Sequence, residues 1–237
     1  MQINAMARPF TATDDEILLA ARKVITLHGP DAFSIAAVAT EVGLSRAAII
    51  LRFKSTHALK VASLEKMVQQ FVEVLETLPK TPSGDNVLRV AAFIGSYVRT
   101  RESSVRFFSN YYSSSVLDRE LLDLERRRGD ALHAAISRVM PETTIDHDAT
   151  VVAFRAHLTG SIMAWLGLDD QDSRRYVLMR STEWLSLARI PFSKQVVREL
   201  SAPQAAGAAQ VRSKTARSKA KRTVKPPTRR SKSVDAS

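Results

Sequence analysis

The sequence predicts an all-α protein with a small N-terminal helical domain and a larger helical domain behind it. Apolar residues recur every three or four positions along most of the chain, and no segment alternates as a strand does. Serine, threonine and glycine residues stand where helices are expected to begin and end. An apolar fraction of 45% over 237 residues is enough to bury a sizeable core.

The first helix is expected to begin after Thr13, because Glu16 three residues later completes a capping-box pattern. Its apolar stripe consists of residues at helical spacing: Ile17, Ala21, Val24, Ile25 and His28. Gly29 and Pro30 then end the helix.

Residues 34–53, SIAAVATEVGLSRAAIILRF, have the pattern of a helix–turn–helix. Ser34 and Ser45 can cap the two helices, and Gly43 stands at the turn, where a positive φ costs glycine least. The apolar residues of both helices recur on one face: Val38, Ala39 and Val42, then Ile49 and Phe53. Such a pair can set its second helix into the DNA major groove, so the segment predicts sequence-specific DNA binding.

A long helix follows, capped by Ser55 or Thr56 and running through Leu78, and the loop PKTPSGD at 79–85 ends it. Further helices are expected at about 86–101, 104–113, 117–140, 147–168 and 173–189.

The last two of these helices are the most apolar. The stripe of the first comprises Val151, Leu158, Ile162 and Trp165, widened by Val152, Met163 and Leu166. The stripe of the second comprises Val177, Ser181, Trp184 and Ala188, flanked by Leu178 and Leu185. Helices apolar over so much of their girth must be covered on more than one side, within one subunit or between two. Because dimers match two-fold DNA sites, we expect a homodimer through these helices.

The positive charge is concentrated at the C-terminal end. Residues 211–237 hold ten Lys or Arg against the single acid Asp235, whereas the remaining 210 residues hold 25 basic and 23 acidic side chains. From about Ala202 large apolar residues are almost absent, which predicts disorder. Such a tail either binds DNA phosphates without sequence preference or only improves solubility.

Several classes of protein are disfavoured. No run of apolar residues is long enough to span a membrane, and the first ten residues lack the apolar core of a signal peptide. The absence of cysteine excludes disulfides and thiolate ligands and fits a reducing cytosol. Ser63 and Lys66 form a lone S-x-x-K motif, and the run at 146–148 has the composition of an acidic helix start. We therefore expect no catalytic site, no metal and no cofactor.

Residues 14–65 resemble, without a gap, the N-terminal DNA-binding domain of TetR-type transcriptional regulators. The matching features are the glycine before a serine cap in HGPDAFS, Ala39, the Gly-Leu-Ser turn at 43–45, Ile49 with Phe53, and Ala58-Leu59. The later helices resemble the family in number and order, and in a Trp-bearing apolar pair at the end.

The resemblance implies a cytoplasmic, nucleoid-associated transcriptional regulator. Residues 1–54 would form an N-terminal arm and the DNA-binding domain, 55–200 a helical domain for ligand binding and dimerisation, and 201–237 a basic tail. The expected partners are palindromic double-stranded DNA, a second copy of the chain and a small-molecule effector that releases a repressor from its operator.

The candidate DNA contacts are Ser34, Ser45, Arg46, Ala47, Ala48, Ile50, Leu51, Arg52, Lys54 and Thr56. Arg46 can bind a guanine edge or a phosphate. Ile50, Ala48 and Thr56 replace a Tyr, a Thr and a Lys that are usual in the family, and Lys54 can supply the missing charge. Of Ile50 and Leu51, one is expected to be exposed and the other to have a core role.

The candidate effector pocket comprises Arg106, Phe107, Tyr111, Tyr112, His133, Arg155 and His157. The aromatic run would suit a small apolar or aromatic effector, and core packing explains the same residues equally. Two other functions stay open: an architectural, largely nonspecific DNA-binding protein, favoured by the basic tail, and a helical enzyme, for which no catalytic constellation is found.

Overall fold

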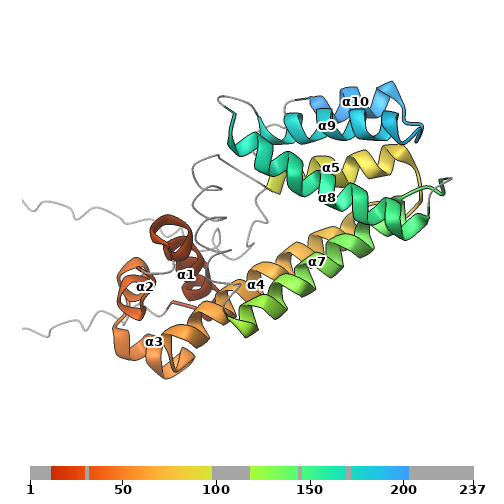
Figure 1. The fold of residues 1–237 in the computed structure, drawn as a ribbon. Coiled ribbons are helices and arrows are strands. Elements are labelled where there is room, and N and C mark those ends of the chain that lie inside the picture. The colour runs from red at the N-terminus through yellow and green to blue at the C-terminus, as the bar shows by residue number, and fades with distance from the viewer. Residues whose placement is uncertain (1–11, 30–31, 98–117, 144–145, 169–171, 203–237) are drawn as a thin grey trace, which may run out of the picture. The chain divides into compact units, whose positions relative to one another are not determined.

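The computed structural model of this 237-residue chain describes residues 12–29, 32–97, 118–143, 146–168 and 172–202. Within these ranges the chain forms nine helices and no strand (Figure 1), which confirms the all-α prediction there. None of the described helices combines the length and the apolarity needed to cross a membrane.

The first three helices are α1 (Asp14–His28), α2 (Ile35–Val42) and α3 (Arg46–Phe53). The predicted capping box of α1 is confirmed. The Glu16 N–H donates to the Thr13 hydroxyl at 3.2 Å, and the Thr13 N–H donates to the Glu16 carboxylate at 2.8 Å. Two backbone N–H groups at the start of α1 thus each have a side-chain oxygen as acceptor.

Serine caps fix the starts of α2, α3 and the long helix α4 (Thr56–Thr77). The hydroxyls of Ser34, Ser45 and Ser55 each accept a hydrogen bond from the backbone N–H three residues later, at 3.2, 3.1 and 3.0 Å. Ser55, rather than Thr56, is therefore the cap of α4.

The helix α4 contributes to two apolar cores. Its first half packs with α1, α2 and α3 around buried side chains that include Ile17, Val24, Val38, Ile49, Leu59 and Leu64. Through Phe71 and Leu75, its second half joins a core formed with five later helices: α5 (Gly84–Tyr97), α7 (Arg119–Val139), α8 (His147–Leu166), α9 (Ser173–Leu187) and α10 (Lys194–Ser201).

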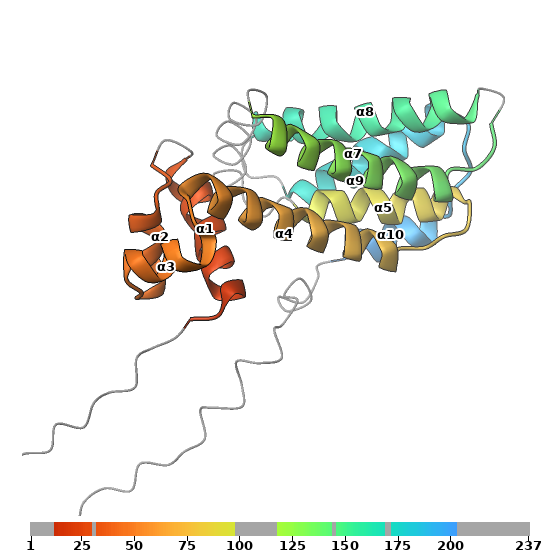
Figure 2. The same cartoon turned by 90° about the horizontal axis from the view of Figure 1, so that it is seen from below.

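The helices α4 and α7 lie side by side along much of their length (Figures 1 and 2). Leu121 and Leu124 of α7 belong to the first core, and Leu132 and Ile136 of the same helix belong to the second. Two long helices therefore connect the helix–turn–helix with the C-terminal helices, because both contribute side chains to both cores.

The described helices begin and end within a few residues of the predicted ones. The helix expected at 104–113 lies outside the described residues, as does the end of the helix expected at 86–101. The predicted basic tail also lies outside them, apart from its first residues.

The short helix α10 is absent from the sequence-based expectation. Its start is fixed by residues far away in the chain: the Asp85 carboxylate accepts from the Ser193 N–H at 2.6 Å and from the Ser193 hydroxyl at 2.8 Å. The Arg89 guanidinium donates to both oxygens of Glu199, at 2.9 and 3.0 Å. Its two buried residues, Val196 and Leu200, are too few to stand out as a helical stripe.

The helix α8 is buried on one face and exposed on the other. The expected stripe of Val151, Leu158, Ile162 and Trp165 is buried. Val152 and Met163, which were expected to widen this stripe, are 46% and 43% exposed in the single chain, so the described part of the chain leaves them partly uncovered. They lie on the opposite side of the helix, where nothing among the described residues covers them fully.

Candidate functional site

The turn between α2 and α3 depends on Gly43. This residue has φ 67° and ψ 30°, the left-handed conformation that residues with a side chain rarely adopt. The Gly43 N–H donates to the Thr40 carbonyl at 3.4 Å, and the Leu44 N–H donates to the Ala39 carbonyl at 3.0 Å. These bonds close the end of α2 and set the direction in which α3 begins.

The helix α3 has one buried and one exposed face. Ile49 is fully buried in the first core and Phe53 packs against it. Arg46 and Ala47 are exposed, and Ile50 and Leu51 are 44% and 74% exposed. The expectation that one of the two aliphatic residues has a core role is therefore wrong, because Ile49 and Phe53 already fill the side of α3 that faces the core.

Arg52 is held at the start of α1. Its Nη1 donates to the Ala12 carbonyl at 2.5 Å and lies 3.3 Å from an oxygen of Asp14. A guanidinium tied in this way fixes α3 against α1. The position of Arg52 thus favours orienting the helix over contacting a base.

Lys54 stands at the end of α3 in a strained conformation. Its φ of 66° and ψ of −48° place it at the centre of a γ-turn, in which the Ser55 N–H donates to the Phe53 carbonyl at 2.7 Å. The Lys54 Nζ donates to the Leu51 carbonyl at 2.8 Å and so neutralises part of the negative end of α3. The tight turn allows α4 to begin at once.

Three helix N-termini lie close to this segment in sequence, at Ser34, Ser45 and Thr56, each with unpaired backbone N–H groups that suit phosphate oxygens. Among the described residues, the Arg46 guanidinium has no hydrogen bond and no ion pair, and Ala48 is half-buried. The segment therefore combines open N–H groups, one free guanidinium and an apolar outer face.

The candidate effector residues are only partly described. Arg106, Phe107, Tyr111 and Tyr112 lie outside the described residues. His133 of α7 lies 3.2 Å from the Asp148 carboxylate, and the Arg155 guanidinium donates to the Gly129 carbonyl at 3.4 Å, so both lie between α7 and α8.

His157 lies on the other side of α8, against α9. Its ring is 5.9 Å from that of Phe154 and 6.1 Å from that of Trp184, and the Phe154 and Trp184 rings are 4.9 Å apart. Burial lowers the pKa of His157, and the nearby Arg180 guanidinium lowers the pKa further. The structure thus separates His157 from the other two described candidates.

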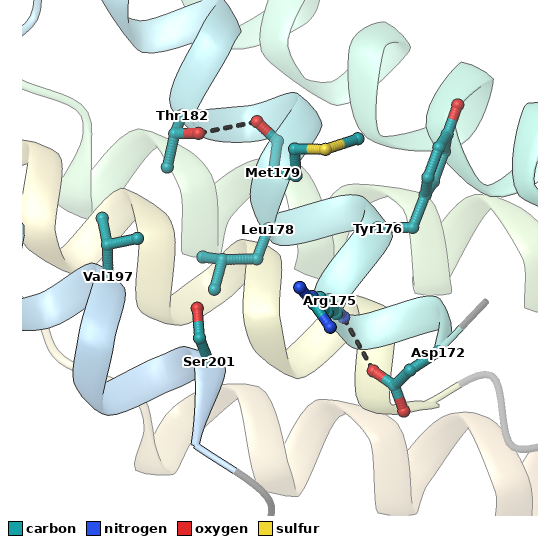
Figure 3. Close-up of a pocket in the computed structure, with 8 residues that line it drawn as sticks. All are labelled: Asp172, Arg175, Tyr176, Leu178, Met179, Thr182, Val197 and Ser201. Atoms are coloured by element: carbon teal, nitrogen blue, oxygen red, sulfur yellow. Dashed lines mark hydrogen bonds between the residues drawn. The ribbon is translucent and has the colours of Figure 1, made fainter.

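A groove between α9 and α10 lies apart from all these residues (Figure 3). It encloses about 680 Å³ and is lined by Asp172, Arg175, Tyr176, Leu178, Met179, Thr182, Val197 and Ser201. One wall of this groove belongs to α10, and the sequence carries no sign of that helix beyond the four-residue spacing of Val196 and Leu200. Within the described part of the chain, no three His, Asp or Glu side chains gather as a metal site would require.

Residues 17–62 match the family model described as bacterial regulatory proteins, tetR family. This segment contains most of α1, the whole helix–turn–helix and the start of α4. No curated protein sequence matches the chain.

Solved structures share the fold over most of the chain. A putative transcriptional regulator from Saccharomonospora viridis, in complex with choline, is 16% identical, with 73% of this chain and 95% of that chain covered and a TM-score of 0.61. A TetR transcription regulator from Haloarcula marismortui is 19% identical, with 74% and 97% covered and a TM-score of 0.61. The regulator FadR from Bacillus subtilis, in complex with stearoyl-CoA, is 16% identical, with 74% and 97% covered and a TM-score of 0.58. At these identities the likeness shows a common fold.

Proposed function

Because this chain belongs to the TetR family of bacterial regulatory proteins, we propose that it is a dimeric, sequence-specific DNA-binding repressor that a small-molecule effector releases from its operator. The observation that carries the proposal is the exposed outer face of α3 within the segment that matches the family model.

In this proposal α3 enters the major groove of double-stranded DNA. Arg46 lies on the first turn of the helix, where its fork can reach guanine O6 and N7. Ala47, Ala48, Ile50 and Leu51 complete the surface that faces the groove. The remaining candidates, Ser34, Ser45, Lys54 and Thr56, would contact phosphates, while Arg52 would orient α3 through Ala12 and Asp14.

The dimer is proposed to form through the outer faces of α8 and α9. From Val152 on, the exposed residues of α8 are small, apart from two large apolar ones: Val152, Ala153, Ala156, Thr159, Gly160, Met163 and Ala164. On α9, Met179 and Leu187 are 45% and 85% exposed. Small side chains let a partner helix approach closely, and a self-complementary apolar patch suits a two-fold interface. Two recognition helices would then read half-sites about 34–36 Å apart, or a multiple of that distance.

The effector is proposed to bind within residues 55–200. Two of the solved structures with the same fold hold small molecules, choline and stearoyl-CoA. In this chain the rings of Phe154, His157 and Trp184 form an aromatic cluster between α8 and α9, and we propose that an apolar or aromatic effector binds beside this cluster. Such an effector would favour a state whose recognition helices no longer match the half-site spacing. The protein would act on chromosomal DNA in the cytoplasm.

The test is selection of bound sequences from a random duplex library with the full-length chain. A repressor of this kind should enrich an inverted repeat. A chain ending at Ala209 should enrich the same repeat, because a flexible basic tail has no fixed donors with which to read bases. A bound pool without a common sequence would contradict the proposal and support the architectural alternative.

A further inference from the structure

The recognition helix α3 has few hydrogen-bond donors left on its outer face. The Arg52 guanidinium is bound to Ala12 and Asp14, and the Ser45 hydroxyl accepts from the Ala48 N–H. Lys54 Nζ is bound to the Leu51 carbonyl. Among the described residues of this face, Arg46 is the strong donor that has no bond to the protein itself, and it stands on the first turn, so we expect hydrogen-bond reading of bases mainly at that end.

The middle and the end of the outer face are apolar instead. Ala47 lies three residues from Ile50 and four from Leu51, so the three side chains are neighbours on the helix surface. Leu51 is 74% exposed and Ile50 is 44% exposed. The core is already filled from this helix by Ile49, so the two aliphatic side chains have no place to pack within the described chain.

Charge around this patch fits DNA as its occupant. Arg46 precedes the patch, at the positively polarised start of α3, and Lys54 follows the patch. A phosphate backbone on each side of a groove complements such an arrangement. Among the groups that base pairs present in the major groove, the apolar one is the C5-methyl group of thymine.

On the basis of the proposed function, we propose that Ile50 and Leu51 read the C5-methyl groups of thymine, so that each operator half-site carries A·T pairs opposite these side chains. The contact recognises a methyl group at C5 and makes no hydrogen bond to the base. A cytosine methylated at C5 presents the same group at the same place in the groove, so 5-methylcytosine should replace thymine at these positions with less loss than cytosine.

The test uses the full-length chain and the duplex that it selects from a random library. Each thymine of the selected half-site is replaced in turn by deoxyuridine, which lacks only the methyl group. Replacement opposite Ile50 or Leu51 should weaken binding about fourfold per methyl group, and replacement elsewhere should have no effect. Replacing the same thymine by cytosine and then by 5-methylcytosine should lose affinity and regain part of it.

The side chain responsible is identified with Leu51→Ala and with Leu19→Ala as a matched control, since Leu19 is 65% exposed but lies on α1. Leu51→Ala should bind the parent duplex about tenfold more weakly and should lose the sensitivity to deoxyuridine at one position. Leu19→Ala should keep both the affinity and the sensitivity. Helical content measured by circular dichroism shows whether the variant is folded, and the deoxyuridine scan with the parent chain does not depend on it.

A selected consensus whose binding is indifferent to deoxyuridine at every thymine would overturn this inference and leave the proposed repressor intact. Selection without any consensus would instead overturn the proposed function. Sensitivity to deoxyuridine that persists unchanged in both Leu51→Ala and Ile50→Ala would show that the methyl groups are read by other residues.

Discussion

Of the helices that expose large aliphatic side chains, α3 and α8 differ in what surrounds these side chains. On α3, Ile50 and Leu51 stand between Arg46 and Lys54 at one end of the first core. On α8, Val152 and Met163 stand mainly among small side chains over the second core, whereas Met179 and Leu187 of α9 share their helix with the exposed charged residues Arg180 and Glu183. Apolar exposure is similar on α3 and on α8, but the patch on α3 has Arg46 at the helix N-terminus on one side and Lys54 on the other.

The surroundings therefore indicate which partner each face suits. Cations at both ends of the patch on α3 favour phosphate and oppose contact with a second copy of the same face, because like charges would meet. Alanine and glycine residues on α8 let an equivalent helix approach closely, which favours a second copy of this chain. We therefore propose that apolar side chains serve DNA recognition on α3 and self-association on α8.

The largest expected effect comes from placing a charge on the face of α8. Met163→Glu should weaken the dimer by about 3–5 kcal/mol, because the new carboxylate would be buried without a partner. Sedimentation should show monomers that keep the helical content of the parent and have lost operator binding. Leu19→Glu on α1 is the control and should remain dimeric. A parent chain that sediments as a monomer at micromolar concentration would rule out the interface.

On the face of α3, Arg46→Ala should weaken operator binding by about 1–3 kcal/mol and relax the preference at one base pair per half-site. The dimer should be unaffected, since Arg46 lies on α3 and the proposed dimer forms through α8 and α9. Binding is measured with operator variants that carry each base pair at every position. An equal loss on all sequences would place Arg46 on a phosphate instead.

The turn before α3 can be tested by comparing the effect on stability of substituting two glycines. Gly43→Ala should destabilise the folded chain by about 1–2 kcal/mol, because alanine resists the positive φ at the turn. Gly129→Ala, within α7, should instead stabilise by about 0.5–1 kcal/mol, since a Cβ there meets no atom closer than 4.0 Å. Thermal unfolding of both variants gives the two signs, and a stabilising Gly43→Ala would contradict the described turn.

The smallest expected effect is a pH dependence of folding stability that arises from His157, which lies between α8 and α9. Burial lowers the pKa of His157, so the unfolded chain takes up a proton before the folded chain does. Stability should therefore be lost as the pH falls below about 6.5, the ordinary value for histidine. His157→Gln should remove this part of the pH dependence. Chemical denaturation on both sides of that pH measures it, and an unchanged dependence in the variant would exclude His157 as its source.

The sequence predicts the helix–turn–helix well because its determinants are local. Thr13, Ser34 and Ser45 bond to groups three residues away, and the Gly43 N–H also donates to a carbonyl three residues away. The same local signals indicate which face of α3 is buried, but they do not show that both Ile50 and Leu51 remain outside.

Features that depend on residues far apart in the chain could not be predicted from the sequence. Arg52 looks like a free donor for DNA until the fold brings Ala12 and Asp14 beside it, some forty residues earlier in the chain. The helix α10 depends on Asp85 and Arg89, more than one hundred residues before it, so its short apolar pattern carries little weight alone. The groove between α9 and α10 could not be predicted either, because α10 forms one of its walls.

The difference between the two faces is tested most directly by side-chain labelling of the full-length chain with and without its selected duplex. We expect Ile50 and Leu51 to be labelled in the free protein and protected when DNA is added. We expect Met163 and Leu187 to be protected in both states, because the proposed dimer would cover them throughout. Labelling of Leu51 that is unchanged by bound DNA, or full labelling of Met163 and Leu187 in the free protein, would contradict the account.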